Sequence, residues 1–401
     1  MSDFFAQPSV WLISIIKVIV VMALMMTALA YLSWFERKVV AHIQSRWGPY
    51  RVGPHGLLQP LADGLKFLFK EDPTPGGVDK LVYFLAPFLA MSLALCSIAV
   101  IPFGPSPLLQ VANVNIGLLI IFAITSLGVY GVALGGWASN SKYPLLGGLR
   151  SSAQMVSYEL SMTMSVVGVV LMAGTFNLRD IITQQQGYWL GFIPRWNLLA
   201  PPFPQVLGFF IYFVSAIAET NRVPFDLPEA ETELVAGFHT EYASFKFAMF
   251  FMAEYANMIT VSCLATLLFF GGWLSPLPST GVMAWTLYIP AAALAACAVT
   301  LFIDGLRYST KFGRILLPIL SLALAGLAAV CAMDGVVHII QGPFWFLSKV
   351  FLFLFFYVWL RGTLPRFRYD QLMSFGWKLL LPLSIANVVL TSWFVLASMT
   401  K

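Results

Sequence analysis

Long apolar runs separated by short polar segments make up most of the 401-residue chain. A helix needs about 20 consecutive apolar residues to cross the hydrocarbon core of a bilayer. Ten runs approach or exceed that length, and they lie near residues 10–34, 82–102, 114–137, 152–174, 203–220, 247–273, 283–303, 314–334, 345–361 and 378–398. The pattern predicts an all-α polytopic membrane protein with about ten transmembrane helices.

One polar segment has a helical pattern of its own. Within residues 56–70, Gln59, Asp63, Lys66 and Lys70 recur at helical spacing, while leucines fill the other faces. A helix with one polar and one apolar side lies in the membrane interface rather than across it. We therefore expect an amphipathic interfacial helix in this segment.

Charge is scarce and unevenly placed. Hydrophobic residues make up 59% of the chain and charged residues only 10%, against about 25% charged residues in an ordinary soluble domain. Most of the 23 Lys and Arg residues fall in the loops 35–81, 219–246 and 361–378 or in other loops of the same side. Because basic loops stay in the cytoplasm, these are predicted inner loops and both termini are predicted to lie outside. This bias accounts for the net charge of +5. The sequence has no basic run interleaved with aromatic residues, the pattern that would predict nucleic-acid binding.

Acidic residues lie where a bilayer penalises them. Glu159 and Glu254 lie about two turns inside predicted spans, Glu219 closes the fifth span, and Glu241 precedes the sixth. A carboxylate at the bilayer centre costs about 2.5–3.5 kcal/mol on insertion scales. Desolvation favours the protonated form, so such groups can load and release protons. The alternative is a glutamate hydrogen-bonded between helices or paired with an arginine, but several deep acids together favour a proton or charge relay.

The second inner loop is unusually acidic. Pro228 suits the first turn of a helix, and nearby glutamates would complement the positive end of that helix. A helix start does not explain the whole set, which comprises Glu219, Asp226, Glu229, Glu231, Glu233 and Glu241. Like charges this close repel, so we expect basic partners from another chain or protonation of some members.

The first inner loop combines charge with apolar surface. Arg37, Arg46, His55 and Asp63 lie among Leu, Phe and Trp residues. Such a mixture could hold a ligand with a polar head and an apolar tail. The alternative is an amphipathic helix that binds lipid headgroups, and spacing alone favours this second interpretation.

Motifs for bound redox groups or nucleotides do not occur. Cys96, Cys263, Cys297 and Cys331 lie singly in apolar runs, whereas an iron–sulfur cluster needs about four grouped thiolates. The sequence has no histidines at metal-ligand spacing, no P-loop and no dinucleotide fingerprint. We expect no metal or flavin in this chain, so any redox centres would lie on partner chains.

Four long stretches resemble the H subunit of bacterial NADH–quinone oxidoreductase (respiratory complex I), whose mitochondrial counterpart is NADH dehydrogenase subunit 1. They are FERKVVAHIQSRWGPYRVGPHGLLQPLADGLKFLFKED from Phe35, AETNRVPFDLPEAETELVAGFHTEY from Ala218, FFMAEYANM from Phe250, and GPFWFLSKVFLFLFFYVWLRGTLPRFRYDQLM from Gly342. The resemblance covers about residues 1–275 and 342–401. That family usually has eight spans, so residues 276–341 would insert two more, with a role that the sequence does not reveal.

The resemblance implies a non-redox translocase subunit of a proton-pumping enzyme in the inner membrane of a bacterium. Its substrate would be ubiquinone or menaquinone, and its partners would be the hydrophilic subunits with the terminal iron–sulfur cluster and small membrane subunits leading to antiporter-like ones. By residue match, the quinone chamber would comprise Glu36, Arg37, Arg46, Asp63 and Phe225, beside the acidic loop with Glu229, Glu231 and Glu233. The path for protons or charge would comprise Glu159, Glu219, Asp226, Glu241 and Glu254.

Two other functions remain open at this point. The nearer one is the homologous membrane subunit of an energy-converting hydrogenase-type complex, which would copurify with a nickel–iron subunit. The farther one is a self-sufficient secondary transporter. Such transporters often contain internal repeats with paired broken helices, and this sequence shows no such repeat.

Overall fold

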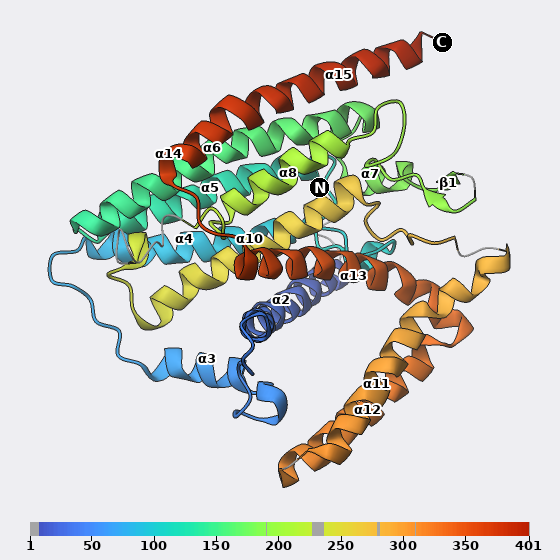
Figure 1. Ribbon diagram of the computed structural model, residues 1–401, viewed down its shortest axis with the longest axis horizontal. Helices are drawn as coiled ribbons and strands as arrows, with labels where there is room; N and C mark the ends of the chain where they lie inside the picture. The colour runs from blue at the N-terminus through green and yellow to red at the C-terminus, as the bar shows by residue number, and fades with distance from the viewer. Residues whose placement is uncertain (1–7, 190, 227–235, 279–280, 309, 401) are drawn as a thin grey trace.

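A computed structural model of the chain describes residues 8–189, 191–226, 236–278, 281–308 and 310–400. Helices dominate it (Figure 1). In chain order the elements are α2 (Pro8–Ile43), η1 (Pro54–Gly56), α3 (Gln59–Phe69), α4 (Lys80–Ile98), η2 (Pro107–Leu109), α5 (Gly117–Ala138), α6 (Lys142–Ala173), α7 (Leu178–Gln184), β1 (Tyr188–Trp189), β2 (Ile193–Pro194), α8 (Val206–Glu219), η3 (Gly237–His239), α10 (Ser244–Phe269), η4 (Gly281–Tyr288), α11 (Ile289–Arg307), α12 (Lys311–Cys331), α13 (Asp334–Thr363), α14 (Tyr369–Phe375), η5 (Gly376–Leu380) and α15 (Leu381–Met399).

The predicted fold class is confirmed. Within the described ranges, nine helices are long and apolar enough to cross a membrane, and α8 is a shorter apolar helix. Each of the ten predicted spans overlaps one of these helices, and α3 lies inside the segment predicted to be amphipathic. The two short strands β1 and β2 pair antiparallel in a small hairpin.

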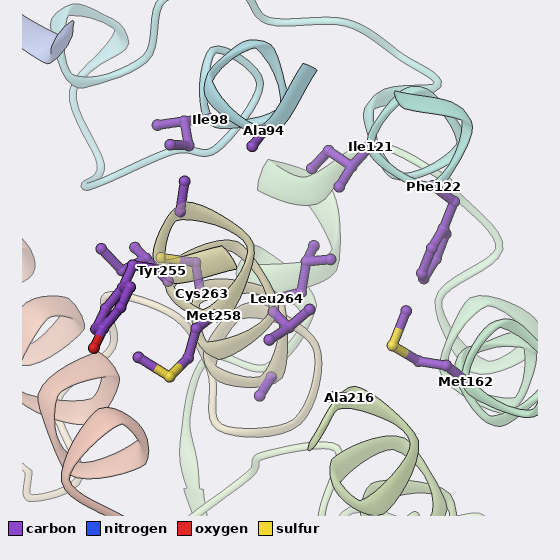
Figure 2. Packing of buried hydrophobic residues seen from close by; sticks show 14 of the residues in the cluster. Ala94, Ile98, Ile121, Phe122, Met162, Ala216, Tyr255, Met258, Cys263 and Leu264 are labelled. Atoms are coloured by element: carbon purple, nitrogen blue, oxygen red, sulfur yellow. The ribbon is translucent and has the colours of Figure 1, made fainter. Parts of the chain in front are cut away.

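The core of the bundle lies around α10. Every residue from Met258 to Phe269 is buried, as expected of a helix that is apolar on all faces. α4, α8 and α13 pack against it, and Figure 2 shows side chains such as Ile98, Ile121 and Ala216 gathered around its Leu264. The central position of α10 places any polar residue on its inner half deep in the protein.

Two predicted loops contain more helix than expected. α2 continues to Ile43, so the predicted inner loop 35–81 begins inside a helix. The loop 361–378 contains α14, which runs through η5 into α15. Apolar run length marks only the part of a helix that lipid surrounds, whereas polar turns beyond it stay helical where protein contacts satisfy them. We call the end of the bundle that carries these two loops and the loop 219–246 the inner end.

The segment 276–341, expected to add two spans, contains a helical hairpin. α11 and α12 pack mainly on each other, and the pair extends away from the main bundle in Figure 1. The side chain of Thr310 caps the start of α12 by accepting a hydrogen bond from the backbone N–H of Gly313 (3.2 Å). α12 also contacts η1 in the first inner loop, so the hairpin is not an isolated appendage.

A lysine closes the far end of α10. Lys349 on α13 donates hydrogen bonds to the carbonyls of Phe270 (2.7 Å), Gly272 (3.0 Å) and Leu274 (2.7 Å), and its Nζ lies 4.4 Å from the ring centroid of Trp196. The last carbonyls of a helix lack intrahelical partners, and a cation there also complements the helix dipole. Lys349 therefore joins α13 to the central helix.

We expect Lys349→Met to lower the apparent melting temperature of the detergent-solubilised complex by several degrees. The substitution leaves three carbonyls without their donor, and a hydrogen bond to a charged group contributes about 1.5–3 kcal/mol. The exposed Lys66→Met variant on α3 is the matched control and should melt like the unmodified protein. Equal melting of Lys349→Met and the control would contradict this assignment.

Candidate functional site

A cavity of about 910 Å³ opens at the inner end of the bundle. We call it the polar cavity. It lies where the end of α2, the first inner loop, α10 and the end of α13 meet. Its lining consists of Glu36, Arg37, Val40, Gln44, Arg46, Gly48, Pro49, Val223, Phe251, Tyr255, Arg361, Leu364, Pro365 and Arg366. The volume falls within the range of about 300–1,000 Å³ that is usual for small-molecule sites.

One buried carboxylate holds the wall of the polar cavity together. Glu36, whose side chain is only 5% exposed, forms ion pairs with Arg222 (3.4 Å) and Arg361, and it accepts a hydrogen bond from the hydroxyl of Tyr255. The guanidinium of Arg222 also lies over the Tyr255 ring, 4.2 Å from its centroid. A carboxylate removed from water needs such partners, and these come from three separate parts of the chain.

The remaining residues predicted on the first loop lie at the outer rim of this wall. Arg37 forms an ion pair with Asp63 on α3 (2.6 Å), and the amide of Gln59 donates to the other carboxylate oxygen of Asp63 (3.0 Å). Arg46 donates from Nε to Gln44 (2.8 Å). Through Arg37 and Asp63 the amphipathic helix is attached beside the cavity.

Behind the polar cavity, α8 ends at Glu219 and the chain continues as buried, nonhelical backbone. α8 has 14 residues, about 21 Å of helix, which is less than the hydrocarbon thickness of about 30 Å. The nonhelical segment that follows, from Thr220 to Asp226, which we call the unwound segment, is buried at every residue, so its backbone groups need hydrogen-bond partners from the protein. Gln154 on α6 serves this segment, because its amide donates to the carbonyls of Ala218 (2.8 Å) and Phe225 (2.9 Å).

The unwound segment brings two of the predicted acids together. A second, small cavity of about 30 Å³, which we call the carboxylate cavity, is lined by Glu219 and Glu254 together with Thr220, Asn221 and Asn257 among others. A site needs roughly 10–15 Å³ and several polar partners to hold one water molecule, and this cavity offers both. Oε2 of Glu219 has no hydrogen-bond partner among the described residues, so a water in the cavity would satisfy it.

The third deep acid lies beside this pair. Glu159 on α6 accepts a hydrogen bond from the hydroxyl of Ser126 on α5, and it is close enough to Glu219 for their charges to interact. The three acids predicted inside or at the end of spans therefore form one group. Within the described ranges, no ion pair with an arginine immobilises Glu159 or Glu219.

Adjacent residues face the two cavities. Tyr255 lines the polar cavity and its neighbour Glu254 lines the carboxylate cavity, because successive side chains of an α-helix point about 100° apart. Two adjacent residues of the unwound segment also face opposite ways, because Asn221 lines the carboxylate cavity and Arg222 forms an ion pair with Glu36. One layer of protein thus separates the polar cavity from Glu219 and Glu254.

Three predicted residues lie apart from both cavities. Phe225 lines an apolar groove of about 720 Å³ between α8, α13 and α14, where it stacks on Phe367 with ring centroids 5.6 Å apart. Asp226 forms an ion pair with Arg366 (3.3 Å), which itself lines the polar cavity. Glu241 lies before α10, where its carbonyl accepts from the hydroxyl of Tyr83 (2.7 Å).

The acidic loop itself, with Glu229, Glu231 and Glu233, lies outside the described residues. Conversely, sequence reasoning missed Arg222, Tyr255, Arg361 and Gln154 as members of the site. Arg222 lies in the acidic loop and Tyr255 adjoins Glu254, so both could have been found from that position. Nothing in the sequence around Arg361 or Gln154 indicates a role in the site. Only folding brings Arg361 to Glu36 and Gln154 to the unwound segment.

Among the described residues, no three His, Cys, Asp or Glu side chains lie together in a way that could hold a metal ion. The four cysteines are free thiols. The described residues of the site offer charge: arginines and a carboxylate around an open cavity, with three further carboxylates behind it.

Comparison with known proteins identifies the family. The family model described as NADH dehydrogenase matches residues 16–392. The NADH-quinone oxidoreductase H subunit 1 of Solibacter usitatus is 52% identical over 390 residues, which cover 96% of this chain and 96% of the relative. The H subunit 2 of Koribacter versatilis is 52% identical over 402 residues, covering 96% and 97%, and the H subunit of Thermomicrobium roseum is 44% identical over 93% of each chain.

The chain belongs to the H-subunit family of NADH-quinone oxidoreductases. As a member of this family it is a membrane subunit of complex I, a multi-subunit enzyme. The names of these relatives point to the NADH-quinone enzyme rather than to the hydrogenase-type alternative.

Glu36 and Arg37 are neighbours in sequence, but substituting them should change the stability of the complex by very different amounts. We expect Glu36→Gln to destabilise the complex by on the order of 3 kcal/mol, because two arginines lose their buried counter-charge. Arg37 is half exposed in its pair with Asp63, so Arg37→Gln should cost no more than about 1 kcal/mol. Thermal unfolding of the purified complex measures the contrast. Equal losses in both variants would show that the buried ion pairs do not hold this wall.

Proposed function

We propose that this chain forms the quinone-access chamber of a proton-translocating NADH:quinone oxidoreductase. We further propose that it starts the carboxylate path that couples quinone reduction to proton pumping. The observation that carries the proposal is the arrangement across α10, where an arginine-rich cavity and a group of acids share one wall, with Glu219 buried and Glu159 and Glu254 half-buried.

The charges of the polar cavity suit a quinone head that becomes negative on reduction. Among the described residues, the cavity is lined by one carboxylate, Glu36, and by the four arginines Arg37, Arg46, Arg361 and Arg366. Fixed cations around a site where negative charge develops stabilise that charge, and the effect grows where water is excluded. Val40, Phe251 and Leu364 in the same lining offer apolar contacts to the isoprenoid tail of ubiquinone or menaquinone.

The other chamber residues act from the edges in this proposal. Asp63 fixes Arg37 and the amphipathic helix, and Phe225 would offer an apolar contact from the adjoining groove, where it stacks on Phe367. Glu229, Glu231 and Glu233 would form the acidic loop beside the chamber. In this proposal the quinone head lies at the inner surface, where electrons would arrive from the terminal iron–sulfur cluster of a hydrophilic partner subunit.

Coupling would start with the charge on the reduced quinone. A unit charge acts on another about 10 Å away by on the order of 1–2 kcal/mol at an effective dielectric constant near 20. An interaction of this size would weaken or strengthen the ion pairs of Glu36. It would also shift the protonation equilibria of Glu254, Glu219 and Glu159 behind them. Asp226 and Glu241 would connect this group to the inner surface. The small membrane subunits and the antiporter-like subunits would receive the signal from the buried acids.

The proposed location follows from the predicted topology. The chain would lie in the inner membrane of a bacterium with both termini on the periplasmic side. In that orientation the polar cavity would face the cytoplasm. NADH would be oxidised on that side, and the reaction would be a step of respiratory electron transport.

We expect Glu254→Gln and Glu159→Gln each to lower quinone-coupled NADH oxidation and proton pumping about tenfold, the scale of a 1.4 kcal/mol loss. Glutamine keeps the size of the side chain but can neither bind nor release a proton. Activity and pumping are measured in the assembled complex in proteoliposomes. Glu71→Gln, at an exposed position of the first loop, is the matched control. Full activity and full pumping in both buried variants would refute the carboxylate path.

A further inference from the structure

The first inner loop adopts a conformation that needs support. Its residues Ser45, Gly48, Gly53, His55 and Gly56 all have positive φ angles, from 53° to 78°. Glycine adopts such angles freely, but serine and histidine do so only where their surroundings enforce it. His55 has φ 53° and ψ 17°, so some contact must hold it in this left-handed state.

That contact comes from the inserted hairpin. The backbone N–H of His55 donates to the hydroxyl of Tyr308 at 3.0 Å, although the two residues are 253 positions apart in sequence. The Tyr308 ring packs edge-on against the His55 ring (centroids 5.2 Å apart) and also lies 6.2 Å from the ring of Tyr50. The side-chain hydrogen bond to Tyr308 raises the pKa of Tyr50 above its ordinary value.

Tyr308 is itself fixed by the hairpin. It is only 7% exposed although it lies at the tip between α11 and α12. Gly313 lies under its ring, and a Cβ at that position would overlap the ring atoms. Arg314 donates from Nε to the Tyr308 carbonyl at 2.7 Å. The hairpin thus presents a preorganised hydroxyl to the loop rather than a mobile side chain.

The supported loop is part of the polar cavity. Gly48 and Pro49 line the cavity, and Tyr50 follows directly. On the bundle side, Lys38 of α2 donates to the carbonyl of Pro49 (3.1 Å) and lies 5.6 Å from the centroid of the Tyr50 ring. The loop is therefore clamped between α2 and Tyr308.

We propose that the inserted hairpin α11–α12 is a docking element that sets the shape of the cavity mouth, with Tyr308 as its positioning residue. The docking follows from the contacts alone, whereas its effect on quinone rests on the function proposed for the polar cavity. The alignments with the two relatives at 52% identity span 96% of the chain and so run through the hairpin.

The test uses three variants in the complete complex. Tyr308→Phe keeps the ring and removes the hydroxyl, Tyr308→Ala removes both, and Tyr288→Phe at the other end of α11 is the matched control. Hydrogen–deuterium exchange of the peptide containing residues 50–58 reports docking. Steady-state kinetics with a short-chain quinone report the cavity mouth.

We expect Tyr308→Phe to accelerate exchange at the His55 amide and to raise the KM for quinone about three- to tenfold, the effect of one lost hydrogen bond. The kcat should stay within about twofold, since no group that meets the quinone head changes. Tyr308→Ala should show larger effects, and Tyr288→Phe none.

Unchanged exchange in Tyr308→Ala would overturn the docking. Faster exchange with an unchanged KM would overturn the positioning of the cavity mouth, provided that Arg361→Met, which alters the cavity lining directly, does change quinone kinetics. If Arg361→Met also leaves quinone kinetics unchanged, the function proposed for the polar cavity fails, while the exchange result still decides the docking.

Discussion

Buried backbone that is not helical lacks the hydrogen bonds of a helix, so other parts of the protein must supply partners, and this constraint organises the whole site. α8 is about 9 Å shorter than the hydrocarbon core is thick, and the buried nonhelical segment from Thr220 to Asp226 continues from its end. Because this segment must be enclosed, α6, α10 and α2 close around it and supply Gln154, Tyr255 and Glu36 as partners. Glu219, which precedes it, and Asp226, which ends it, are thereby buried in the protein.

The enclosure also explains why the two cavities lie back to back. Arg222 extends from the unwound segment toward Glu36, while Asn221 and Glu219 face the other way. The ion pairs of Glu36 join α2, α13 and the unwound segment, so they determine both the wall of the polar cavity and the setting of the buried acids. A charge that appears in the cavity therefore acts first on groups whose pairing holds the structure together.

The helices can be predicted well from the sequence, because run length and polarity are local properties. Glu159 and Glu254 lie about two turns inside predicted spans and Glu219 lies at the inner end of the span between them, and the structure places the three acids near one another. No local pattern reveals that Arg361 meets Glu36, which lies 325 positions away, or that Phe225 turns to the apolar groove. The position of Glu241 before the sixth predicted span groups it with the deep acids, but in the structure it lies beside Tyr83 and lines neither cavity. The docking of the hairpin at Tyr308 likewise arises only in three dimensions.

The central claim is that charge in the polar cavity changes the protonation of the acids across α10. Redox-induced infrared difference spectroscopy of the assembled complex, recorded with and without quinone, tests it most directly. The account predicts a protonated-carboxyl band that appears only with quinone, loses intensity in Glu254→Gln, and weakens when Arg222→Met breaks the link to Glu36. A quinone-dependent spectrum without any carboxyl band, or one that both substitutions leave unchanged, would contradict it.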